Sequence, residues 1–305
     1  MELARLALRP NASSRSRHAA DTDCLDQSGG EAPHREATGW STRPLCCRYL
    51  AVTFETQFVA VRRYEAVREH ELRWAIGVVA DGQCEVLGFW WDSIPGIFDW
   101  AEVFAELTLR GVESIAFVSG EEPNLLGGAT HTSYPAAKVL ASVAKLLRGS
   151  VADMAPRDRR SARRMLSGLR TAGSVLAARA LLNSIAAGPF GARYPSTTKL
   201  WSRALLQLEP RYELPRRLQR FIRRGEDAAE QLHRGLSRAI ERHGCFGDQL
   251  EVTQYVVEFL ERAGVGPGLL EGPLTEVKRF APRGRFARHA SGPRTSVSDS
   301  SAASV

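Results

Sequence analysis

Paired arginines are the first residues of this sequence whose type and spacing suggest a chemistry. Four pairs lie in the second half of the chain: Arg159-Arg160, Arg163-Arg164, Arg216-Arg217 and Arg223-Arg224. A guanidinium group can donate two parallel hydrogen bonds to the oxygens of one phosphate, and clusters of arginines bind the phosphate backbone of nucleic acids. Solvated helix faces carry the same pairs, so both interpretations stay open. A net charge of +7 and a pI of about 9.5 favour a polyanionic partner.

Cysteine and histidine give no metal-ligand pattern. The five cysteines are Cys24, Cys46, Cys47, Cys84 and Cys245. Their number is odd and no CxxC pair occurs, so we expect reduced thiols in a cytosolic protein and no zinc site. His233 and His243 share no ligand spacing with other histidines. No apolar run approaches the roughly 20 residues of a membrane helix, and we expect no membrane partner.

Two glutamates have surroundings that the local sequence leaves open. Glu55 lies among apolar neighbours in the stretch CRYLAVTFETQFVAV, so it is either a half-buried site acid or an outward-facing strand residue. Glu230 lies in a helical stretch of mixed polarity, where a solvated surface acid is the ordinary expectation. Local pattern alone therefore assigns neither residue a role.

The stretch from Leu72 to Ser119 predicts an α/β core. Its apolar patterns indicate strands over Leu72–Ala80 and Cys84–Trp91, a helix over Ile97–Arg110 and a short buried strand over Ile115–Val118. Asp81-Gly82 is a two-residue hairpin turn, and Gly111 suits a helix C-terminus because glycine readily takes positive φ. We expect the last strand to run parallel in the same sheet and Trp90, Trp91 and Trp100 to be packing residues.

Helices dominate the second half of the predicted structure. A first strand over Cys47–Val61 leads through 64–70 into the hairpin, and the loop GEEPNLLGGATHTSYP after Ser119 has at most a short helix. Helices are then predicted over Ala136–Ala152, Pro156–Ala187 (two helices), Thr197–Leu208, Leu214–Arg224, Asp227–His243 and Gln249–Ala263. The two ends are poor in periodic pattern and are expected to be disordered.

Several of these segments together resemble one family. The stretches are WSTRPL, RYLAVTFETQFVAVR, AIGV…GQCEVLGFWW, FDWAEVFAELTLRGVESIAFVS, RYPSTTKLW and GEDAAEQLHRGLSRAIERHGCFGD. They are similar to the catalytic region of the mutator-type insertion-sequence transposases, and the likeness extends from Trp40 to Ala263. It implies an RNase H-like fold with three catalytic acids, the DDE triad. It also implies that the long N-terminal helical region of such proteins is missing here.

The resemblance carries the acidic positions onto particular residues. The first catalytic Asp of the family falls on Glu55, and the second, from an Asp-Gly pair, falls on Ser119. The terminal Glu falls on Glu230, with Asp227 and His233 at the two flanking Asn positions. A Cys and a His of the family fall on Ser142 and Lys145, in a register that ends on the matching segment Arg148 to Val151. The Gly-Phe turn of the family falls on Gly244 and Phe246. Two of three acidic positions are therefore altered.

By resemblance, Glu55 and Glu230 would be catalytic residues and ligands of Mg²⁺. In such sites carboxylates hold two divalent ions about 3.5–4 Å apart. A Glu in place of Asp adds a methylene, and the Ser119 hydroxyl supplies no charge, so we expect weakened metal binding and impaired catalysis. Glu121 and Glu122 are near Ser119 in sequence, but we expect their side chains to approach the metal site from another direction. Glu55 and Glu230 should face one cleft with Ser119 at its rim.

The sequence thus predicts an α/β, RNase H-like mixed sheet that begins with three antiparallel strands and carries an α-helical insertion and C-terminal helices. The expected parts are a disordered segment 1–38, the first core part 39–155, the insertion 156–222, the core-completing helices 223–263 and a disordered basic tail 264–305.

The function implied is DNA cleavage and strand transfer of an insertion element, impaired in this copy. A non-catalytic DNA-binding or assembly remnant, or a pseudogene product without a selected role, is the alternative. We expect DNA as partner, a homo-oligomer if the protein is functional, and a cytoplasmic location. The expected DNA-binding residues are Arg216, Arg217, Arg223, Arg224, Arg234 and Arg238.

Overall fold

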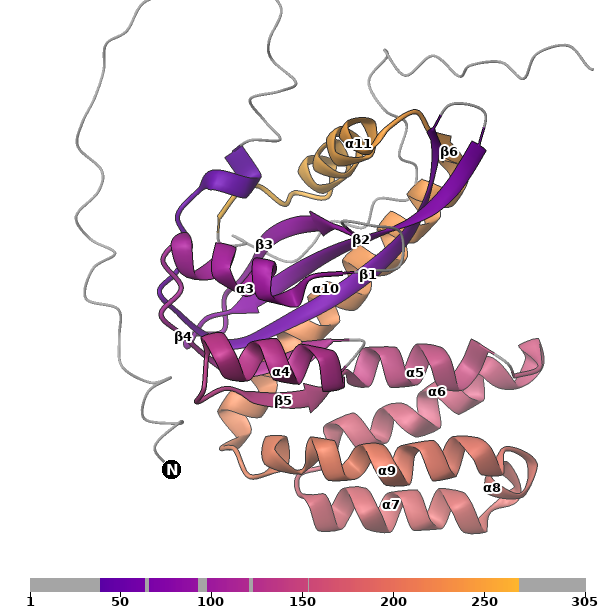
Figure 1. Cartoon of the computed structure of the whole chain (residues 1–305). Helices are drawn as coiled ribbons and strands as arrows, with labels where there is room; N and C mark the ends of the chain where they lie inside the picture. Colours follow the sequence, from indigo (N-terminus) through magenta and orange to yellow (C-terminus); the bar gives the residue numbers. More distant parts are fainter. Residues whose placement is uncertain (1–38, 64–65, 93–97, 121–122, 153, 269–305) are drawn as a thin grey trace, which may run out of the picture.

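A mixed sheet forms the centre of the computed structural model, which describes residues 39–63, 66–92, 98–120, 123–152 and 154–268 (Figure 1). Its strands are β1 (Arg48–Arg63), β2 (Ala66–Val78), β3 (Cys84–Trp91), β4 (Ser114–Gly120), β5 (Lys138–Ala141) and β6 (Cys245–Phe246). They lie in the order β3-β2-β1-β4-β5, with β6 paired to β1 off this path. The predicted α/β class is confirmed.

The direction of the strands also agrees with the sequence pattern. β1, β2 and β3 are antiparallel neighbours, and the hairpin between β2 and β3 turns at the predicted Asp81-Gly82. β4 runs parallel to β1, as expected, and β5 runs parallel to β4. β4 pairs with the first residues of β1, and β6 pairs with Ala60 and Val61 further along. One long strand therefore organises the whole sheet.

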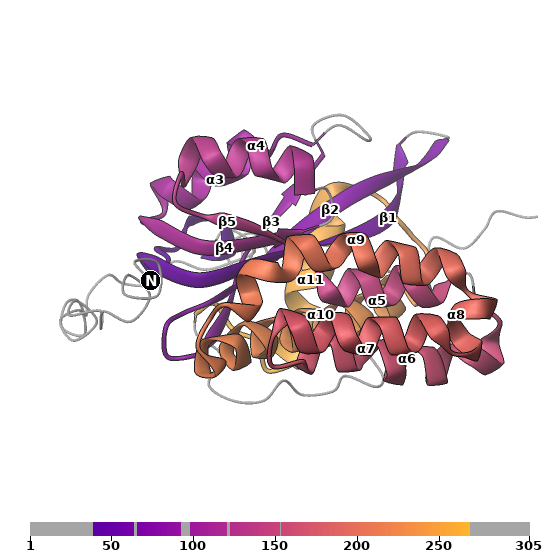
Figure 2. The same ribbon diagram turned by 90° about the horizontal axis from the view of Figure 1, so that it is seen from below.

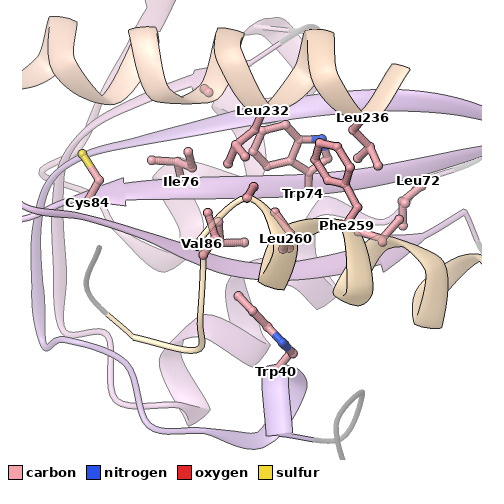
Figure 3. Close-up of a cluster of buried hydrophobic side chains, with 14 of the residues drawn as sticks. Trp40, Leu72, Trp74, Ile76, Cys84, Val86, Leu232, Leu236, Phe259 and Leu260 are labelled. Carbon is pink, nitrogen blue, oxygen red and sulfur yellow. The ribbon is translucent and has the colours of Figure 1, made fainter. Parts of the chain in front are cut away.

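Helices cover both faces of the sheet (Figures 1 and 2). On one face lie α3 (Trp100–Leu109) and α4 (Pro123–Ser133), and on the other lie α10 (Arg216–His243) and α11 (Gln249–Arg262). Figure 3 shows Trp74 of β2 among Leu232 and Leu236 of α10 and Phe259 of α11. The α3 face is aromatic, because Phe54 contacts the rings of Trp90, Trp100 and Phe104.

A separate helical block follows β5. It contains α5 (Val143–Ala152), α6 (Pro156–Thr171), α7 (Val175–Ala187), the short α8 (Pro189–Arg193) and α9 (Pro195–Tyr212). These helices share their own core around the fully buried Trp201, whose indole nitrogen donates to Ser150 Oγ at 2.8 Å. The two helices expected within Pro156–Ala187 are confirmed as α6 and α7. The block ends where α9 leads into α10, which returns to the sheet.

The expected loop after Ser119 is wrong, because α4 is a helix of 11 residues. Its Gly127-Gly128 pair lowers helix propensity, by about 1 kcal/mol for each glycine relative to alanine. Packing overrides that cost: Leu126 and Thr130 are fully buried, and Thr130 Oγ1 donates to the Leu126 carbonyl at 2.6 Å. Pro at the first helical position, here Pro123, also suits a helix start.

Two further helix predictions are wrong in their boundaries. Residues 138–141 are not helical but form β5, and Ser142 begins α5 by accepting a hydrogen bond from the Lys145 amide at 3.3 Å. The helices predicted over Leu214–Arg224 and Asp227–His243 are one helix, α10, so the boundary expected after residue 222 falls inside it. Gly225 does not break α10, because it lies where the helix crosses Val78 of β2.

The ends of the chain fall largely outside the described residues. Segment 1–38 and residues 269–305 of the expected tail are not described. Residues 264–268 are described, and they extend the core beyond the expected boundary, because Val265 is fully buried and its amide donates to the Leu260 carbonyl at 2.8 Å. No helix in the described part of the chain is long and apolar enough to cross a membrane.

Candidate functional site: an acidic centre beside a basic helix

Alternate residues of β1 aim one polar row at α10. Side chains two apart on a strand share a face, so Thr53, Glu55 and Gln57 point to the same side. Gln57 contacts His233 and Ser237 of α10, which identifies the side as the α10 face. The side chain of Glu55 is only 1% exposed. An acid at this depth needs a compensating partner, because burial strongly disfavours an isolated charge.

Arg148 of α5 is that partner, and it joins the two predicted catalytic acids. Its Nη2 donates to Glu55 Oε2 at 2.5 Å, and its Nη1 donates to Glu230 Oε2 at 2.5 Å. Burial alone would lower the pKa of Arg148, but the charges and hydrogen bonds of Glu55 and Glu230 outweigh it and raise that pKa. The structure therefore brings Glu55 and Glu230 together through one guanidinium group.

His233 completes the surroundings of Glu55. It lies one turn after Glu230 on α10, with Nδ1 3.4 Å from Glu55 Oε2 and 2.9 Å from Gln57 Nε2. Because the Gln57 amide donates to Nδ1, the ring proton is on Nε2 in this arrangement. Ser237 Oγ is within hydrogen-bond distance of two acceptors, Gln57 Oε1 at 3.0 Å and the His233 carbonyl at 2.8 Å, and its one proton can go to either.

His233 is held in its neutral form. Burial lowers its pKa to about 3, and the positive charges of Arg148, Arg234 and Lys145 act in the same direction. Glu55 by itself would favour the charged ring. Its charge is already engaged by Arg148, however, and the Gln57 amide occupies the nitrogen that faces it. The lowered pKa is therefore the direction that fits the contacts.

Ser119 lies on the same face as Glu55 but takes no part in the bridge. It is in register with Thr53 on the neighbouring strand, and its Oγ donates to Thr53 Oγ1 at 3.1 Å. The hydroxyl of the expected second acidic position is thus turned to its own sheet neighbour. Glu121 and Glu122 lie outside the described residues.

The residues present do not fit a two-metal centre. Two divalent ions need several negatively charged oxygens, whereas this centre offers two carboxylates that already share one guanidinium. The third acidic position is a hydroxyl bonded to Thr53. Among the described residues, no group of three or more His, Cys, Asp or Glu side chains is placed to hold a metal ion.

A row of arginines runs along α10 beside this centre. The helix carries eight arginines and four acids, and exposed arginines recur four residues apart along one side in two groups, separated by ten residues. They are Arg216, Arg220, Arg224, Arg234, Arg238 and Arg242. In the last three, Nε donates to the main-chain carbonyl four residues earlier, so these side chains follow the helix axis. We call this row the α10 arginine face.

The structure places all six predicted DNA-binding arginines on α10. Arg216, Arg224, Arg234 and Arg238 belong to the arginine face; Arg217 is exposed next to it, and Arg223 is half-buried. Arg217 also lies over the Phe221 ring at 5.4 Å. Arg234 links the face to the acidic centre, since its Nε is 3.5 Å from Glu230 Oε1. Within this stretch Asp227 pairs with Arg170 of α6.

Sequence reasoning missed the roles of Arg148, Gln57 and His233. The spacing of three between Glu230 and His233 does place them on one helix face, and the spacing of two between Glu55 and Gln57 places them on one strand face. Those two signals could have found the neighbours of each acid. No local signal could have found Arg148, which lies 93 residues from Glu55 and 82 from Glu230.

Sequence comparison shows similarity to insertion-sequence transposases. The family model described as "Transposase, Mutator family" matches residues 32–264. The transposase for insertion sequence element ISRM3 of Rhizobium meliloti (strain 1021) is 30% identical over 216 residues, which are 70% of this chain and 54% of that protein. A probable insertion-element transposase of Corynebacterium diphtheriae is 27% identical over 235 residues, which are 75% of this chain and 68% of that protein.

A probable transposase for an ISRM3-like element from Sinorhizobium fredii (strain NBRC 101917 / NGR234) is 29% identical over 216 residues, again 54% of its length. This chain therefore spans about half the length of the two rhizobial relatives. The family match covers most of the chain and includes Glu55, Arg148 and Glu230. The chain belongs to the Mutator family of transposases.

Proposed function

We propose that this chain is a transposase-family protein that binds DNA along the α10 arginine face and does not cut it. The observation that carries the proposal is the position of Arg148, whose guanidinium forms ion pairs with both acids. The acids lie beside a long basic helix. Family membership supplies the class of partner. The acidic centre supplies the expectation about chemistry.

An RNase H-like fold is part of the proposal. The order β3-β2-β1-β4-β5, with three antiparallel strands followed by two parallel ones, supports it. The first acid on the central strand and the last acid on a helix packed against that strand also agree with the triad geometry implied by the family. The helices between β5 and α10 support an α-helical insertion in this part of the chain.

DNA binding is supported by the charge and shape of α10. From Arg216 to Arg242 the helix rises about 39 Å, at 1.5 Å per residue. Duplex DNA carries one phosphate for each 1.7 Å or so of its axis, so a face of this length can meet several phosphates. We expect binding largely independent of base sequence, because arginines in such a row reach the backbone before the bases.

Loss of strand cutting is supported by charge counting. Glu55 and Glu230 together carry two negative charges, and Arg148 removes one of them. A position that the family fills with Asp is the neutral Ser119 here. The centre therefore has too little charge to hold the metal ions that activate a nucleophile and stabilise a leaving oxygen. Glu55, Arg148 and Glu230 instead join β1, α5 and α10.

Strand cleavage and transfer is the second candidate. It is favoured by one observation, that Glu55 and Glu230 meet although 175 positions separate them in sequence. The cytoplasmic location expected from the cysteines belongs to both candidates, and the homo-oligomer is expected if the protein is functional.

The test compares the chain with its Glu55→Asp/Ser119→Asp variant for Mg²⁺- or Mn²⁺-dependent nicking and strand transfer on element-end DNA. We expect the unmodified chain to bind the DNA and leave it intact. Nicking by the unmodified chain that disappears in Glu230→Ala would establish the second candidate. DNA binding is measured in the same samples, and its absence at 50 mM salt would refute the DNA part of the proposal.

A further inference from the structure

The strongest unassigned feature is the way one side chain satisfies two acids from different elements. Nη1 and Nη2 of Arg148 each contact a different carboxylate, and in both cases the atom contacted is Oε2. The guanidinium therefore lies between Glu55 of β1 and Glu230 of α10. Its side chain is 20% exposed, whereas that of Glu55 is 1% exposed.

Removing this guanidinium would leave a buried negative charge. Two carboxylates that face the same space repel each other, and burial increases the cost. Other cations are near but not equivalent. Arg234 approaches Glu230 through Oε1 at 3.5 Å, and Lys145 is close enough to affect His233. Arg148 contacts both acids directly.

A divalent ion that bridged these acids through Oε2 would use the atoms that Arg148 now contacts. Mg²⁺ binds carboxylate oxygens at about 2.0–2.1 Å, which is shorter than any contact between nitrogen and oxygen. An ion bound to Oε2 of both acids would thus occupy the space in which the guanidinium now lies. Arg148 and a bridging ion exclude each other for steric reasons as well as by charge.

We propose that Arg148 is a built-in cation that occupies the position of a divalent ion between Glu55 and Glu230, so that the pair takes a divalent ion only when Arg148 is removed. The inference rests on the acidic centre of the proposed function and not on DNA binding. Its test uses metal alone, so a failure here leaves the DNA proposal standing, and a failure of DNA binding leaves this inference standing.

The experiment follows thermal unfolding of the full chain against Mn²⁺ without DNA, starting from chelated protein. Arg148→Ala should unfold at a lower temperature than the unmodified chain in chelator. Mn²⁺ at about a hundred times its dissociation constant should then raise the midpoint by roughly 5–10 °C, because it binds the folded form only. The unmodified chain should not respond. Binding is measured as the decrease in the electron paramagnetic resonance signal of free Mn²⁺.

Two further variants assign the response to the acids. Arg148→Ala/Glu230→Gln should lose the Mn²⁺ effect, because one of the bridging carboxylates is gone. Arg170→Ala is the matched control, since it removes a guanidinium that pairs with the half-exposed Asp227 of α10 and no second acid. This control should show no Mn²⁺ response, whatever its stability.

Arg148→Gln provides a second route if Arg148→Ala does not fold, since its amide can still donate to one carboxylate. An unmodified chain that is stabilised by Mn²⁺ through Glu230 would overturn the proposal. So would folded Arg148→Ala and Arg148→Gln variants that ignore Mn²⁺. Failure of both variants to fold even with Mn²⁺ also counts against it, because the ion should replace the guanidinium.

Discussion

At the residue scale, a second guanidinium–carboxylate pair lies one turn from the acidic centre. Arg211 of α9 donates to Glu226 of α10 at 2.6 Å, and both side chains are 3% exposed. Breaking such a pair costs more than the pair contributes, because the remaining charge stays buried without compensation. This pair ties the helical block to the helix that carries Glu230.

We predict that Glu226→Ala lowers the free energy of unfolding by about 3–5 kcal/mol, measured by urea denaturation. The double variant Arg211→Met/Glu226→Leu should recover most of that loss, because no buried charge remains. Glu209→Ala is the comparison, since Glu209 pairs with Arg179 at 3.7 Å on the surface and should cost at most about 1 kcal/mol. Equal losses at Glu226 and Glu209 would contradict the role of burial.

His233 gives a prediction about pH. Its pKa of about 3 lies below the ordinary value of 6.5. Below pH 6.5 the unfolded chain binds a proton that the folded chain does not, so stability falls as the pH drops toward 3. By pH 5 the loss from this residue should reach about 2 kcal/mol relative to pH 8. Denaturation of the unmodified chain and of His233→Gln at both pH values isolates the contribution of His233. The variant should lose less stability on acidification.

The family resemblance points to two acids but not to the group between them. Glu55 and Glu230 are the residues on which the first and last acids of the family fall. Arg148 stands in a matching segment, but its role depends on three elements meeting in space, and no local spacing encodes that. The neutral state of His233 likewise depends on its burial in the assembled fold and on nearby cations from α5 and α10, which together lower its pKa.

At the element scale, α10 depends on a close approach to the sheet. A Cβ at Gly225 would collide with the side chain of Val78, so glycine lets the helix lie against β2 at this point. The residue lies between the part of α10 that follows α9 and the part that carries Glu230. A change in packing here would therefore shift one of the two acids relative to the other.

We predict that Gly225→Ala destabilises the protein by about 1–2 kcal/mol, because overpacking exceeds the gain in helix propensity. Gly128→Ala in α4 is the matched control, since it is also inside a helix and has open space around the position of a Cβ. That change should stabilise the chain, by up to about 1 kcal/mol. Chemical denaturation compares the two. A stabilised Gly225→Ala would mean that α10 does not need the close approach.

Most strands and helices were predictable, whereas α4, β5 and the continuity of α10 were not. The hairpin at Asp81-Gly82 and the parallel β4 follow from alternation and turn chemistry. α4 was missed because its two glycines argue against a helix, and burial of Leu126 and Thr130 decides otherwise. β5 gives no strand signal in the sequence, because four residues before Ser142 are too few to show a period.

At the scale of the whole molecule, the surplus of positive charge is distributed unevenly. The chain carries 41 Lys and Arg against 34 Asp and Glu. Much of the paired charge is used inside the fold, as with Arg148, Arg211 and the Arg110–Glu106 pair. The arginines of the α10 arginine face are exposed instead, as are Arg157, Arg159, Arg160, Arg163 and Arg164 of α6, and the α10 face also runs next to the acidic centre. A polyanion that meets the molecule should therefore prefer this side.

The last prediction tests that preference through salt. Each phosphate contact contributes about 0.9 to the slope of the logarithm of affinity against the logarithm of salt concentration. Arg234→Gln/Arg238→Gln/Arg242→Gln should lower the magnitude of the slope by about 2 to 3, measured by fluorescence anisotropy with duplex DNA between 50 and 200 mM salt. The control removes the same charge from the helical block through Gln at Arg179, Arg193 and Arg203, all of them exposed. We expect the control slope to stay within about one contact of the unmodified chain. Equal reductions in both triple variants would mean that net charge, and not the α10 arginine face, holds the DNA.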